Sequence, residues 1–136
     1  MDRTVFFDRV RAKPFGGSLT QHQVDGLNAI LDAADKHGVT DVRHLAYALA
    51  TAFHETARTM LPIAEYGRGK GRKYGVKGKY GQVPYGRGYV QLTWDENYER
   101  ADKELGLGGK LLKNFALALD PAIAAAIMFR GMAEGW

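Results

Sequence analysis

A glycine-rich segment at residues 66–90 constrains the fold of this chain more than any other feature of its sequence. The segment holds eight glycines and five tyrosines and shows no apolar repeat of helical or strand period. A stretch of this length without regular structure is uncommon inside a compact domain, and such stretches tend to be functional. We therefore expect a long loop, or a small hairpin, between helical segments.

The rest of the chain carries helical signals. Helices are expected in five stretches, at about 20–37, 41–58, 95–105, 110–119 and 120–129, and in the first two apolar residues recur at helical spacing. Gly38 closes the first stretch, and Thr40 is expected to cap the second. Asp120 followed by Pro121 is typical of a helix start and opens the last. The sequence therefore predicts a mainly α fold.

Length and composition limit the class of protein. A chain of 136 residues is long enough for one domain with a core and too short for two. No cysteine is present, which excludes disulfides and thiolate metal sites. The sequence has no signal-peptide-like start and no apolar run of about 18 residues, so we expect synthesis in the cytoplasm and no membrane insertion.

The basic residues are concentrated in the glycine-rich segment. Seven lie between residues 67 and 88, with no acidic residue among them: Arg68, Lys70, Arg72, Lys73, Lys77, Lys79 and Arg87. Since the whole chain holds 19 Lys and Arg against 15 Asp and Glu, the remainder is slightly acidic. A local basic strip indicates a polyanionic partner, and a solubilising loop is the alternative.

Glu55 is the most informative residue of the second helix. At about 100° per residue, the apolar face centres near Val42 and Leu49, and Glu55 lies roughly 130° away, beside Ala48 and Thr51. These small neighbours would border a groove with a carboxylate at its edge. The helix dipole disfavours a negative charge near the last turn, which suits a general acid. A solvated glutamate on a polar face is the alternative.

A metal site is not expected. His54 and Glu55 begin like the zinc-protease motif, but Arg58 stands where that motif requires a second histidine. The chain has only four scattered histidines and no cysteine.

Three blocks of sequence occur together in a fixed order. Residues 53–56 read FHET, residues 85–93 read YGRGYVQLT, and Asn97-Tyr98 follow. This arrangement resembles glycoside hydrolase family 19, the chitinase family that includes many phage endolysins. The resemblance runs from about residue 40 to the chain end, and the opening sequence and residues 65–69 are similar to the phage and prophage branch. It implies a single lysozyme-like helical domain.

The resemblance also implies a reaction, the inverting hydrolysis of a β-1,4 bond next to an N-acetylated sugar. Glu55 matches the general acid of the family. Glu65 is our candidate for the base, because it is the only other acid between Glu55 and Asp95. Its loop position allows the carboxyl separation of about 6.5–9.5 Å that an inverting water requires. Thr93 matches the position that helps to hold that water.

Further residues of these blocks are expected to contact the substrate: His54, Tyr85, Arg87, Gln91 and Asn97. The amides of Gln91 and Asn97 suit sugar hydroxyl and acetamido groups. For Tyr85 and Tyr89, stacking on a sugar ring and packing in the core are equal alternatives. Two carboxylates and a water suffice for the reaction, so no cofactor is implied.

The expected function is that of an endolysin-type glycosidase, a monomer that cuts the glycan strands of peptidoglycan. The protein would be made in the host bacterial cytoplasm and act at the cell wall after release. Three alternatives remain open: a chitinase, an inactive wall-binding protein and a nucleic-acid-binding module. Related endolysins usually continue beyond the position of Trp136, so residues 1–136 are expected to be one catalytic domain shortened at its C-terminal end.

Overall fold

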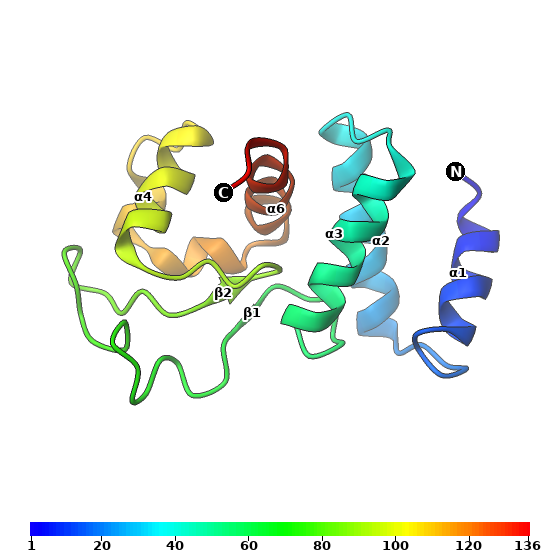
Figure 1. Cartoon of the computed structure of the whole chain (residues 1–136), viewed down its shortest axis with the longest axis horizontal. Helices are drawn as coiled ribbons and strands as arrows, with labels where there is room; N and C mark the ends of the chain where they lie inside the picture. The colour runs from blue at the N-terminus through cyan, green and yellow to red at the C-terminus, as the bar shows by residue number, and fades with distance from the viewer.

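The structure, a computed structural model, describes all residues from 1 to 136 and is mainly helical, as expected. Figure 1 shows α1, α2 and α3 on one side of the molecule, α4 and α6 on the other, and the two short strands with the long loop along one edge. The elements are α1 (Arg3–Ala12), α2 (Gln21–Lys36), α3 (Val42–Glu55), β1 (Ile63–Ala64), β2 (Arg87–Gly88), α4 (Asp95–Glu104), α5 (Lys110–Lys113), the 3-10 helix η1 (Phe115–Leu119) and α6 (Pro121–Glu134).

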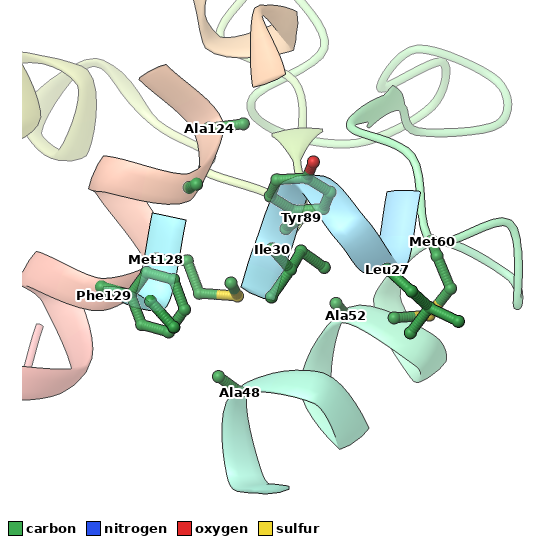
Figure 2. Close-up of a cluster of buried hydrophobic side chains, with 11 residues drawn as sticks. Leu27, Ile30, Ala48, Ala52, Met60, Tyr89, Ala124, Met128 and Phe129 are labelled. Carbon is green, nitrogen blue, oxygen red and sulfur yellow. The ribbon is translucent and has the colours of Figure 1, made fainter. Parts of the chain in front are cut away.

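Helix α6 is shared by two hydrophobic clusters. The larger cluster joins side chains of α2, α3 and α6 with Met60 and Tyr89 (Figure 2). The smaller cluster joins α4, α5 and η1 with Ile127 of α6. Ala125 and Phe129 of α6 belong to the larger cluster and lie about 160° around the helix axis from Ile127, so nearly opposite sides of this helix contact the two halves of the domain. An alanine-rich helix suits this position, because small side chains let both halves approach it closely.

Helix α3 ends earlier than expected. It was expected to reach about Arg58, but its last residue is Glu55. The buried hydroxyl of Thr56 accepts a hydrogen bond from the Met60 N–H at 3.0 Å, and Ala57 and Arg58 adopt positive φ angles of 51° and 71°. Residues in that left-handed region cannot continue a right-handed helix. Glu55 therefore lies at the end of the helix.

The expected buried face of α3 is only partly right: Leu45, Leu49 and Phe53 pack against the core, but the most buried side lies closer to Ala48 and Ala52. Val42 is 75% exposed at the start of the helix, whereas Ala48 and Ala52 are fully buried against the core. Leu49, on the expected face, is only partly buried. Glu55 follows Ala48 by seven residues, which is within about 20° of two full turns. Glu55 therefore lies at the margin of the buried side of α3, where it is still exposed.

Three smaller expectations about the helices need correction. Asp41, rather than Thr40, caps α3, since its side chain accepts the Arg43 N–H. The helix expected over 110–119 divides into α5 and η1, because Asn114 leaves the helical conformation and its side chain caps η1. Helix α1 was not expected at all. Its sequence has no strong apolar pattern, because none of its residues is fully buried. Part of its attachment to α2 is polar, through hydrogen bonds from Arg3 to Asn28 and Asp32.

The glycine-rich segment has little regular structure, yet it is attached to the domain along its length. Its strand β2 pairs antiparallel with β1, outside the segment. The ring of Tyr74 packs edge-on against Trp94 at 5.3 Å, and Lys79 forms an ion pair with Glu99 at 3.2 Å. The side chain of Gln82 bonds to backbone groups of α5 and η1. The expected long loop is present, and these contacts give it a defined path.

Gly26 provides a test of how α2 packs against the chain at Met60. A Cβ atom at Gly26 in α2 would collide with the backbone carbonyl of Met60. If the space were open, Gly26→Ala would stabilise the helix by about 1 kcal/mol. We expect the opposite, a fall of about 1–3 kcal/mol in the free energy of unfolding, because the added methyl overpacks the contact. Urea unfolding measures the difference. The exposed Lys36→Ala should change it by less than about 0.5 kcal/mol, and a more stable Gly26→Ala protein would contradict this packing.

Candidate active site

A cavity of about 330 Å³ lies between α3 and the chain from residue 90 to 97. Its wall includes Thr51 of α3 together with Gln91, Thr93 and Asn97. This volume lies within the usual range for small-ligand sites, about 300–1,000 Å³. The structure thus brings three of the sequence-predicted site residues to one hollow, beside the helix that carries Glu55.

Glu55 and His54 lie at the end of α3, the helix that also contributes Thr51 to the cavity wall. Glu55 follows Thr51 by one turn, a spacing that places Cβ atoms about 5–6 Å apart. Around the helix axis, Thr51 lies between Glu55 and His54, at about 40° from the first and 60° from the second. Both side chains are exposed, and neither forms a hydrogen bond or an ion pair within the protein. Both are therefore accessible to solvent, although neither belongs to the cavity wall.

Glu65 is half-buried directly after β1, and its carboxylate is held at both oxygens. Oε1 accepts the Gly86 N–H at 2.9 Å, and Oε2 accepts the Tyr74 hydroxyl at 3.1 Å. The Glu65 N–H also donates to the Gly86 carbonyl at 2.8 Å. No hydrogen bond joins Glu65 to Glu55. Each carboxylate oxygen has two lone pairs, so Glu65 keeps acceptor capacity for a water or a ligand.

Gln91, Thr93 and Asn97 hold one another and the strand in place. The Gln91 amide donates to the carbonyls of Ile63 and Gly88, both at 2.9 Å. The Thr93 hydroxyl donates to the Gln91 carbonyl and the Asn97 amide to the Thr93 carbonyl, each at 2.8 Å. These donors are used within the protein. The groups that remain for a ligand are the acceptor side of the Thr93 hydroxyl, the amide oxygens and the second N–H of the Asn97 amide.

Arg87 does not lie where a substrate contact was expected. Its side chain is 7% exposed, stacks on the ring of Tyr85 at 3.7 Å, and donates to the Val83 carbonyl and the Tyr98 hydroxyl, each at 3.0 Å. We assign it a structural role, because its neighbours already enclose it. Tyr85 is half-buried over this guanidinium. Tyr89 packs in the larger core cluster, where burial raises its pKa to about 12.

Four aromatic residues near the site were not anticipated. Tyr47 and Trp136 line the cavity, and Tyr74 and Trp94 contact each other beside Glu65. Tyr47 precedes Thr51 by one helical turn, so helix spacing alone would have placed it on the same flank. The contact of Tyr74 with Glu65 depends on the path of the loop, and the sequence carries no signal for it.

The cavity continues into a larger hollow along α3. This second hollow has a volume of about 770 Å³ and reaches the start of α3 at Asp41 and His44. Tyr47, Met132 and Trp136 line both spaces, so the two together form one groove. The groove lies between α3 and the C-terminal end of α6.

Comparisons with known protein families, curated proteins and solved structures find no match to this chain. No group of three or more His, Cys, Asp or Glu side chains is placed to hold a metal ion. None of the helices has the length and apolar character needed to cross a membrane.

The structural role of Arg87 can be tested directly. Arg87→Ala should lower the free energy of unfolding by about 2–4 kcal/mol, because it removes charged hydrogen bonds and opens a cavity. Urea unfolding followed by circular dichroism measures this loss. Arg72→Ala removes an exposed arginine from the same loop and should change stability by less than about 0.5 kcal/mol. Unchanged stability in Arg87→Ala would contradict this role.

Proposed function

We propose that this protein is a glycoside hydrolase of the endolysin kind, with a lysozyme-like fold, that cuts the β-1,4 glycan strands of bacterial peptidoglycan by inversion. The observation that carries the proposal is the cavity shared by Thr51, Gln91, Thr93 and Asn97. Two of the three sequence blocks that resemble the family, residues 85–93 and Asn97-Tyr98, contribute to the wall of this cavity. The third block, residues 53–56, includes Glu55 at the end of α3.

The proposed mechanism needs a proton donor and a water-activating base on opposite faces of the sugar ring. Glu55 is the acid, and its exposed carboxyl is free of internal hydrogen bonds, so a glycosidic oxygen can reach it. Glu65 is the base and removes a proton from the attacking water. Thr93 accepts a hydrogen bond from that water, because its own proton is donated to the Gln91 carbonyl.

The exposed basic residues of the loop support an anionic partner such as the cell wall. Of the seven basic residues in the segment, Lys79 is paired with Glu99 and Arg87 is buried. The other five are exposed and have no ion pair within the protein: Arg68, Lys70, Arg72, Lys73 and Lys77. Their combined field attracts a polyanion, and salt weakens that attraction.

Glu55→Gln tests the catalytic assignment. The protein should reduce the turbidity of Gram-negative cells with permeabilised outer membranes and release fragments with new reducing sugar ends. Glu55→Gln should abolish both effects, because an amide cannot donate the proton, while the thermal midpoint stays close to that of the unchanged protein. The matched control is Glu96→Gln, an exposed glutamate in α4, which should keep full activity. An undiminished rate in Glu55→Gln would rule out Glu55 as the acid.

Charge removal in the loop tests the partner. Replacing Lys70, Arg72 and Lys73 together by Gln should weaken sedimentation with purified peptidoglycan sacculi at low salt and flatten its salt dependence. Single-stranded DNA and insoluble chitin serve as comparison ligands. Tight binding to DNA without cleavage of sacculi would favour the nucleic-acid-binding alternative, and release of chitin fragments alone would favour a chitinase.

A further inference from the structure

We propose that Tyr74 is a positioning residue that orients the Glu65 carboxylate for its role as the base. This inference rests on the proposed function, because it assumes that Glu65 activates water. Tyr74 lies in the middle of the basic loop, nine residues after Glu65, and its hydroxyl donates to Oε2 of Glu65 at 3.1 Å. The loop thus folds back on Glu65, the residue that directly precedes it.

The carboxylate is held from two directions. Oε1 accepts a backbone N–H from Gly86, which a side-chain substitution cannot remove, and Oε2 accepts the Tyr74 hydroxyl. Two donors on different oxygens fix the rotation of the carboxylate plane, which a single donor would leave free. The remaining lone pairs then point in fixed directions, as a base that must receive a proton from one positioned water requires.

The ring of Tyr74 is itself held in place. It packs edge-on against Trp94, at a centroid distance of 5.3 Å and an interplanar angle of 71°. Trp94 has a φ of 77°, an uncommon conformation for a bulky residue, and it follows Thr93 directly. The backbone of Gly69 also lies close to this ring, since a Cβ there would be 3.3 Å from it. The hydroxyl is therefore carried on a ring that contacts both Trp94 and the loop.

Tyr74 keeps its proton at neutral pH. Partial burial raises the pKa of Tyr74 above its ordinary value, and the hydrogen bond to the Glu65 carboxylate raises it further. The hydroxyl is therefore a donor throughout the range in which the enzyme would work. Tyr74 needs no contact with substrate to influence the rate, because it acts through Glu65.

Tyr74→Phe isolates the hydroxyl, because it keeps the ring and its packing on Trp94. We expect kcat to fall on the order of tenfold with KM nearly unchanged, since the variant removes a hydrogen bond to a charged group that does not bind substrate. The thermal midpoint should shift little. Tyr66→Phe is the matched control, because Tyr66 belongs to the same loop, is 76% exposed and makes no hydrogen bond through its hydroxyl.

A double-mutant cycle distinguishes positioning from a merely structural effect. Glu65→Asp retracts the carboxylate from Tyr74, so Tyr74→Phe should have little further effect on kcat in that background. A full tenfold effect there would overturn the proposal, and so would an unchanged kcat in Tyr74→Phe alone. If Glu65→Gln keeps full activity, the assignment of Glu65 as the base fails instead, and the positioning role fails with it.

An absorbance titration tests the contact without any activity measurement. The difference between the titration curves of the unchanged protein and Tyr74→Phe isolates the ionisation of Tyr74. Removing the negative charge with Glu65→Gln should move that ionisation to lower pH, because the carboxylate is one of the groups that raise the pKa of Tyr74. An ionisation that does not move would contradict the contact.

Discussion

The guanidinium of Arg87 determines the geometry on which the candidate site depends. It is enclosed by the rings of Tyr85, Tyr98 and Phe115, and it donates to carbonyls of the loop that contains it. These contacts connect the end of the loop to α4 and η1. Gly86 precedes Arg87 directly, and its N–H holds Glu65. The position of the proposed base is therefore set by a cation that touches neither the base nor the cavity.

The two carboxylates of the proposed mechanism are presented in different ways. Glu55 stands at the end of a helix whose preceding turns are packed through Ala48 and Ala52, so its backbone is fixed while its side chain is free. Glu65 follows a short strand, and both of its oxygens are restrained. A proton donor must follow a leaving oxygen as the bond breaks, whereas a base must wait at one place for a water. The difference in restraint suits this division of roles.

The sequence predicted the mainly α fold and the grouping of Gln91, Thr93 and Asn97, since these depend on spacing along the chain. The predictions of burial were wrong where contacts between distant parts of the chain determine which side chains are buried. Val42 was expected in the core, but the helices meet over Ala48 and Ala52, where small side chains permit closer approach. The burial of Arg87 was also not anticipated, because it depends on the rings of Tyr98 and Phe115, which come later in the chain. The contact of Tyr74 with Glu65 follows from the path of an irregular loop, which no periodicity encodes.

The glycines of the loop and its charged residues differ in how freely they can be replaced. A Cβ at Gly75 would collide with the carbonyl of Gly69, where two turns of the loop cross, and Gly69 itself has a φ of 78°. The side chains of Lys70, Arg72 and Lys73, between these two glycines, are exposed and form no ion pair within the protein. Replacing one of these charged residues therefore leaves the course of the loop unchanged, whereas a side chain at Gly69 or Gly75 would alter it. The course of the loop and its charge are thus encoded by different residues, so the charge can be altered without altering the course.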